Sequence, residues 1–156
     1  MRRSDFDITD KIRTTDAIDV CDEVVRLFGR LFPKGNPRTL ERAFDDLSKY
    51  YHGKHPDYHP CDTEYHDIQH VLDVTLAMAR LLDGYQRESR DDKPLTPELF
   101  TVGVVTALFH DFGYLRKRSD RKHKFGAEYT LTHVSRGSKF LLEYMPAIGL
   151  KKYARD

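Results

Sequence analysis

The sequence predicts an all-α fold, a compact bundle of several helices in one domain. Apolar residues recur three and four positions apart over long stretches, which is the spacing of one helix face. Prolines and glycines separate these stretches. A chain of 156 residues fits one domain and can bury a hydrophobic core.

The N-terminal third predicts two helices after a polar start. Residues 1–15 are polar and irregular and are expected to form an N-terminal arm, whereas residues 16–156 form the single helical domain. The first helix is predicted over 16–32, and the Pro-Gly-Asn-Pro region over 33–37 breaks it. The second helix is predicted over 39–51.

Three further helices are expected in the remainder. Residues 52–63 form a loop, and a long helix over 64–84 presents a broad apolar face and ends at Gly84. A charged loop over 86–93 follows. Thr96 as N-cap and Pro97 at the first helical position start the next helix, which ends at Phe109. Its valines would also suit a strand, but its cap and length favour a helix. The last helix is predicted over 127–144, before Pro146 and Gly149 interrupt the chain.

Charge, hydropathy and cysteine content limit the classes of function that this chain can have. The formal net charge is +1, which is not the basic character of a nucleic-acid-binding domain. No apolar run reaches the ~20 residues of a membrane span, and the charged N-terminus leads into no signal peptide. Cys21 and Cys61 form no metal-type pair, which suits a reducing cytoplasmic location.

Histidines mark the first candidate site. Five of the eight histidines lie between His52 and His70. On the predicted helix His66, His70 and Asp73 are four and three residues apart and share one face. Two imidazoles at this spacing can meet one metal or one substrate. The spacing alone favours the simpler interpretation, a pair of histidines with ordinary hydrogen-bond partners.

His110 and Asp111 add a second candidate. They end a helix that carries no charge from Leu99 to Phe109, so the Asp111 carboxylate is expected near the centre of the fold. A buried carboxylate costs several kcal/mol without a cation or strong donors, so one of these is expected nearby. The alternative is a helix end that reaches the surface, with both groups solvated. Together with His70, the pair favours a metal site.

These segments resemble a known family. The run from Tyr65 to Val74 and the run from Ala107 to Tyr114 are similar to the two motifs of the HD superfamily of metal-dependent phosphohydrolases. The first run looks especially like that of the cyclic-nucleotide phosphodiesterases, with Asp67 in place of an asparagine. The resemblance extends from about Tyr65 to Leu142 and implies an HD-type helical bundle.

The resemblance implies a site and a reaction. His70, His110 and Asp111 would hold one or two divalent ions of Mn, Fe, Zn, Ni or Mg. The metal-activated hydroxide would attack a small phosphoester, such as a nucleotide or cyclic nucleotide, and His66 would be the general acid. Further site residues are inferred less directly. Glu128 and His133 would act as catalytic residues that line the site, and the alternative is that they are a plain surface pair. Asp73 and Arg116 would contact the substrate. The alternatives are that Asp73 is a surface residue and that Arg116 belongs to a solvated basic loop over 116–124.

The sequence also departs from the family pattern. Tyr114-Leu115-Arg116 stands where phosphodiesterases have a further histidine, and the only aspartate after His133 is Asp156, the last residue. Either Asp156 closes the site, or the chain is truncated before the closing helix. The alternative function is therefore a degenerate or truncated, non-catalytic HD-type module that binds a ligand or a protein partner. The sequence leaves open whether the chain forms a homo-oligomer.

Overall fold

The fold is all-helical, as predicted. The computed structural model describes residues 4–88 and 94–154, and within them five α-helices carry the fold: α1 Ala17–Leu31, α2 Arg38–Tyr51, α3 Ile68–Glu88, α4 Pro97–Phe109 and α5 His133–Ala147. Three 3-10 helices connect or follow them: η1 Phe112–Tyr114, η2 Gly126–Tyr129 and η3 Lys151–Tyr153. β-type pairing in this described part is limited to the isolated bridges Phe6–Arg13 and Tyr58–Lys117.

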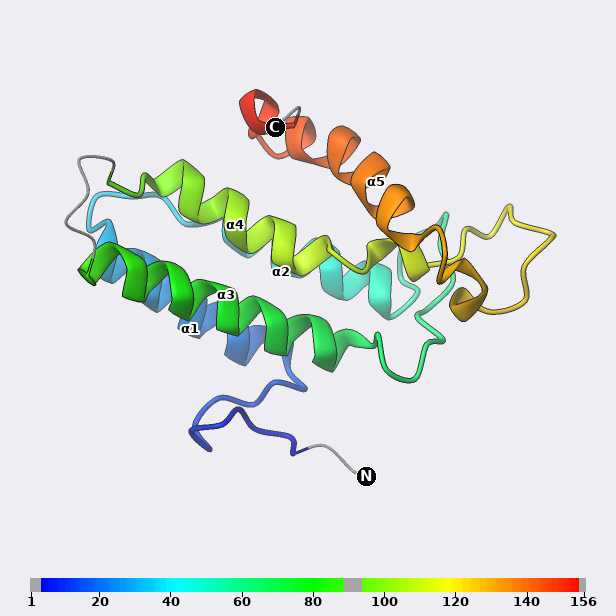
Figure 1. Ribbon diagram of the computed structural model, residues 1–156, viewed down its shortest axis with the longest axis horizontal. Coiled ribbons are helices and arrows are strands. Elements are labelled where there is room, and N and C mark those ends of the chain that lie inside the picture. Colours follow the sequence, from blue (N-terminus) through cyan, green and yellow to red (C-terminus); the bar gives the residue numbers. More distant parts are fainter. Residues whose placement is uncertain (1–3, 89–93, 155–156) are drawn as a thin grey trace.

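The first four helices pack as a bundle, and α5 starts beside η1 at one end of it and runs back along the side formed by α2 and α4 (Figure 1). Helix α3 contacts both α1 and α4, and α2 contacts α1 and α4. Helix α5 packs mainly against η1 and touches α4 less (Figure 1). Helix α5 also reaches the bundle directly, because Tyr144 donates to Asp46 of α2 and the Phe140 ring packs against Phe109 of α4.

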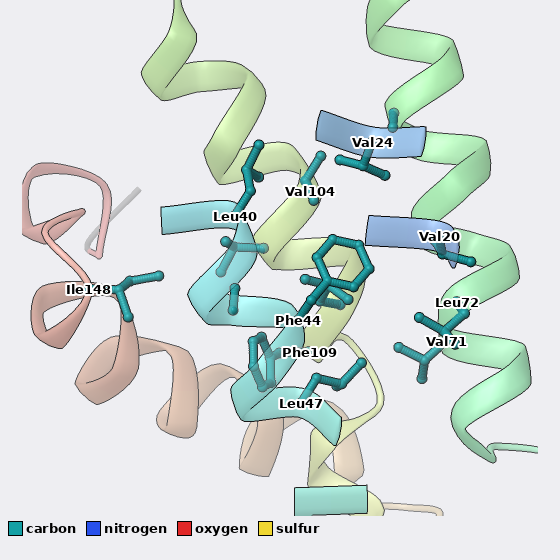
Figure 2. Packing of buried hydrophobic residues seen from close by; sticks show 14 of the residues in the cluster. Val20, Val24, Leu40, Phe44, Leu47, Val71, Leu72, Val104, Phe109 and Ile148 are labelled. Atoms are coloured by element: carbon teal, nitrogen blue, oxygen red, sulfur yellow. The ribbon is translucent and has the colours of Figure 1, made fainter. Parts of the chain in front are cut away.

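The core is built from apolar side chains of all four bundle helices. Val20 and Val24 of α1 and Val71 and Leu72 of α3 are fully buried, and they face Leu40 of α2 and its neighbours (Figure 2). Helix α4 is buried along most of its length, with Glu98, Leu99 and Thr106 as exposed positions. Burying such side chains stabilises the fold by roughly 1.5–3 kcal/mol each before conformational entropy is subtracted.

Three helices begin and end close to where the sequence predicted. The carboxylate of Asp16 accepts the backbone N–H of Ile18 at 2.8 Å and starts α1. The hydroxyl of Thr96 accepts the N–H of Leu99 at 3.2 Å and starts α4, with Pro97 in its first turn. Helix α2 begins one residue before the predicted start and ends at the predicted Tyr51.

The predicted bounds of α3 were wrong at both ends. The helix begins at Ile68, because the Asp67 carboxylate accepts the N–H of His70 at 2.9 Å and acts as an N-cap. It continues through Gly84 to Glu88, and the Asp83–Arg87 ion pair of 3.0 Å spans that glycine. Part of the predicted loop over 86–93 is thus helical, and residues 89–93 lie outside the described residues.

The last predicted helix is divided in two. Residues 126–129 form η2, and α5 begins only at His133 and runs to Ala147. The carboxylate of Glu128 accepts the N–H groups of Lys124 and Phe125, which fixes η2 as a separate turn. Gly149, at φ +90°, follows the end of α5.

The segment before α1 is tied to the bundle through Asp7. Its carboxylate accepts the N–H groups of Lys11 and Ile12 and pairs with Arg80 of α3 at 2.6 Å. Over the described residues, no helix is both long and apolar enough to cross a membrane.

Candidate metal centre

The centre of the candidate site is the Asp111 carboxylate. Helix α4 ends at Phe109, and His110 and Asp111 connect it to η1. Asp111 is only 3% exposed, so it is buried as the sequence predicted. Four imidazoles surround it. Its Oδ2 lies 2.7 Å from His66 Nδ1, 3.1 Å from His110 Nε2 and 3.3 Å from His70 Nε2; His133 Nε2 lies 4.0 Å from Oδ1.

His66 and His70 reach Asp111 from the start of α3, although not by the predicted route. His66 lies in the bend before the helix, so the prediction that His66, His70 and Asp73 share one helix face was wrong. Hydroxyl and thiol groups of Thr63 and Cys61 donate to the His66 carbonyl at 3.2 and 3.4 Å. These contacts hold the bend that turns His66 toward Asp111.

His110 and His133 are oriented by backbone carbonyls. Nδ1 of His110 donates to the carbonyl of Ala107 at 2.8 Å, and Nδ1 of His133 donates to that of Thr130 at 2.7 Å. Nε2 of each ring therefore faces Asp111. This arrangement, with one ring nitrogen fixed by a carbonyl, is common among metal-binding histidines.

Tyr114 holds two of these imidazoles in a stack. Its ring lies 4.3 Å from the His66 ring and 4.3 Å from the His133 ring, at interplanar angles of 20° and 17°. The sequence motifs predicted no role for Tyr114 in the site. The available signal was its spacing from Asp111, since residues three apart lie on one side of a 3-10 helix.

The charge balance at Asp111 depends on the imidazoles. Among the described residues, every basic group within 4.0 Å of this carboxylate is a histidine. Burial raises the pKa of Asp111, but hydrogen bonds and positive charge from His110 and His66 outweigh it and lower the pKa to about 2. The contact with Asp111 in turn raises the pKa of His110, although burial opposes this.

The donor set fits a divalent cation. Donor atoms of His66, His70 and Asp111 all lie within 4.8 Å of one another. Ligand atoms at about 2.0–2.2 Å from one ion lie roughly 2.8–3.6 Å apart in octahedral or tetrahedral coordination, a range that includes the 3.1 and 3.3 Å spacings of His110 and His70 from Oδ2. With His110 Nδ1 donating to Ala107, Nε2 and Oδ2 are two acceptors 3.1 Å apart, so a proton or a cation is needed between them. Imidazole with carboxylate suits Mn, Fe, Zn or Ni.

A cleft of about 620 Å³ opens beside this cluster. His66 and Tyr114 form one part of its lining, and the exposed rings of Tyr65 and Phe125 form another. Carboxylates of three residues complete it: Asp62, Glu64 and Glu128. The cleft therefore joins the histidine cluster to a surface with aromatic rings and negative charge.

The remaining predicted site residues are not joined to Asp111. Glu128 lines the cleft, but its Oε1 is used by two backbone N–H groups, which lower its pKa. Arg116 Nη2 is 3.6 Å from Asp62 Oδ2 and so neighbours the cleft indirectly. Asp73 is half-buried on α3, and no hydrogen bond or ion pair joins its carboxylate to another described residue. Asp156 lies outside the described residues.

No protein-family model, curated protein or solved structure matches this chain.

Proposed function

We propose that this chain is a metal-dependent phosphohydrolase of the HD type that acts on a small phosphoester. The observation that supports this most strongly is the convergence of His66, His70 and His110 on one buried carboxylate oxygen, all within 3.3 Å. His70 and His110 lie far apart in the sequence, and the resemblance implies that both bind metal beside Asp111. Their approach to the same carboxylate supports the proposal.

In the proposed site His70, His110 and Asp111 hold the metal. A bound divalent ion supplies Lewis acidity toward the phosphoryl oxygens and lowers the pKa of water. His110 suits the role of ligand because its Nδ1 is fixed by Ala107 and its Nε2 faces Asp111. The buried carboxylate of Asp111 contributes the negative charge that attracts a cation.

His66 is the proposed proton donor to the leaving oxygen. Its Nδ1 is held by Asp111 at 2.7 Å, and its ring is stacked on Tyr114, so its orientation is defined. Its ring also lines the cleft, where the leaving group would lie. An imidazole held on one side by a carboxylate and open to the substrate on the other is suited to general acid catalysis.

The cleft favours one kind of substrate. Exposed rings of Tyr65 and Phe125 suit a flat group such as a nucleobase. The carboxylates of Asp62, Glu64 and Glu128 repel further phosphates and can accept hydrogen bonds from sugar hydroxyls. The proposed substrate is therefore a nucleoside monophosphate or a cyclic nucleotide, not a polyphosphate.

The test measures metal content and hydrolysis in the same preparations. Purified protein should retain or bind a divalent ion and hydrolyse bis-nitrophenyl or nitrophenyl phosphate with Mn²⁺. His70→Ala and Asp111→Ala should lose both properties. His66→Ala should keep the metal and lose about 10²–10⁴-fold in rate, as expected for a general acid.

His52→Ala is the matched control, because His52 is exposed and its Nδ1 contacts only Ser48 of its own helix. It should retain full metal binding and rate. Metal-independent hydrolysis, or activity that persists in Asp111→Ala, would contradict the proposal. Loss of metal in His66→Ala would make His66 a ligand instead of the acid.

A further inference from the structure

A second hollow, of about 320 Å³, lies on a different side of η1 from the histidine cluster. Asp111 and Tyr114 are three residues apart and contact the histidines, whereas Phe112 and Leu115, also three apart, line this hollow. Residues three apart share one side of a 3-10 helix, so η1 separates the two regions. We call this space the basic hollow.

One wall of the basic hollow is a single face of α5. Arg136, Lys139, Phe140 and Glu143 are spaced three, four and seven residues apart, and all four line it. The opposite wall is the bridge between Tyr58 and Lys117, where Arg118 N–H donates to Asp57 and His59 N–H donates to Arg116. Lys117 is therefore placed by paired backbone and not by a free loop.

The positive charge of the basic hollow is not balanced. Three cations, Arg136, Lys117 and Lys139, line it against one carboxylate, Glu143. Neither lysine makes an ion pair with any carboxylate in the described part of the chain. Arg136 is held in place, because its Nε and Nη2 donate to the carbonyls of Gly113 and Leu115 at 2.8 and 2.9 Å.

The same space has an aromatic wall. The rings of Phe112 and Phe140 are stacked with centroids 3.6 Å apart, and the Tyr58 ring meets Phe112 edge-on at 5.3 Å. Lys117 Nζ lies 5.9 Å from the centre of the Tyr58 ring. Tyr58 and Phe140 are both half-buried and both line the hollow, so part of each ring borders the space beside the cations.

We propose that the basic hollow binds a small organic phosphate, with its phosphate group at Lys117, Arg136 and Lys139 and its aromatic part against Tyr58 and Phe140. Ammonium and guanidinium donors form strong charge-assisted hydrogen bonds to phosphate oxygens. This site is separate from the metal centre and does not depend on the proposed hydrolase activity. It also differs from the cleft beside His66, whose lining is acidic.

Phenyl phosphate and inorganic phosphate are the probes, and calorimetric titration measures their binding. The protein carries Asp111→Asn and is kept in EDTA, so neither hydrolysis nor the metal centre contributes. We expect saturable binding of phenyl phosphate, tighter than that of inorganic phosphate. The pair Lys117→Gln and Lys139→Gln should weaken it by about tenfold or more.

Two comparisons make the result specific. Lys151→Gln with Lys152→Gln removes the same charge from the exposed 3-10 helix η3 and should change the affinity less than about twofold. Glu143→Gln removes the carboxylate of the hollow and should tighten binding severalfold, a gain that loss of folding cannot imitate. Circular dichroism checks that each variant is folded.

Several outcomes would overturn the proposal. The first is the absence of saturable binding. The second is equal weakening by both lysine pairs, which would reflect net charge only. A third is equal affinity for phenyl phosphate and inorganic phosphate, which would mean that the aromatic rings do not contribute to binding.

Discussion

Gly113 is the position where one added methyl group should damage the fold and the site together. A Cβ at this residue would lie 1.8 Å from the carbonyl oxygen of His133, whereas real Cβ atoms essentially never come closer than 3.0 Å to another heavy atom. The two backbone segments in Gly113→Ala must therefore separate by at least 1.2 Å, the difference between these distances. Neither segment is a flexible side chain, so the strain cannot be relieved by a rotamer change.

The loss in the free energy of unfolding depends on which contacts between η1 and α5 this separation breaks. Overpacking costs about 1–3 kcal/mol, and a contact between two backbone segments lies at the upper end. Arg136 also bridges the same segments through Gly113 and Leu115, and its two hydrogen bonds would be strained. We expect a loss of about 3 kcal/mol, which lowers Tm by about 6–12 °C for a chain of this size.

Thermal unfolding followed by circular dichroism measures the effect, with Gly84→Ala as the control. Gly84 lies inside α3, and an added Cβ there meets no atom within 4 Å. That substitution should stabilise the helix by about 0.5–1 kcal/mol, so the two variants should change Tm in opposite directions. A Gly113→Ala protein with the wild-type Tm would refute the close approach of η1 and α5.

Three further predictions concern metal, pH and the role of Glu128. At a free Mn²⁺ or Zn²⁺ concentration of about 100 times Kd, the wild-type chain should gain about 2.7 kcal/mol, or roughly 5–10 °C in Tm; Asp111→Asn should gain nothing in the same scan. Burial raises the pKa of Asp7, but hydrogen bonds from the backbone of Ile12 and from Arg80 outweigh it and hold the pKa well below its usual range. A lowered pKa means that this contribution to stability is complete above the ordinary value of 3.8 and is lost as the pH falls. Denaturant titrations should therefore show Asp7→Asn less stable than wild type by about 1–3 kcal/mol at pH 7, with the difference shrinking toward pH 2; a constant difference would contradict this. Glu128→Gln should leave the rate of nitrophenyl phosphate hydrolysis within about threefold while loosening η2 in hydrogen exchange, because this carboxylate serves backbone N–H groups; a loss of about 10²-fold would restore it as a catalytic group.

Local sequence information was sufficient to predict a helix end where the capping residues within one turn fix that end. Thr96 with Pro97 predicted the start of α4, because an N-cap hydroxyl and a proline act within one turn. The same local rules failed at Gly84. A helical glycine costs only about 1 kcal/mol, and the Asp83–Arg87 pair together with packing outweighs it.

The candidate site was predicted in part. The burial of Asp111 followed from the uncharged helix before it, and His70 and His110 both lie within 3.3 Å of its carboxylate. Their role as metal ligands stays a prediction. The sequence could not indicate that Asp67 caps α3 and leaves His66 outside the helix. From the sequence alone, Asp67 could lie inside the helix or cap its N-terminus, and only the packing of the surrounding residues decides between the two positions.

The sequence by itself therefore determined the all-helical class and the order of its α-helices, the buried aspartate and the residue types available to bind a cation. Only the tertiary structure decided which imidazoles meet. The approach of α5 to Gly113 brings His133 and Tyr114 into one stack with His66. The physical reason is that helix periodicity acts over a few residues, whereas these contacts join segments whose distance depends on the packing of the whole bundle.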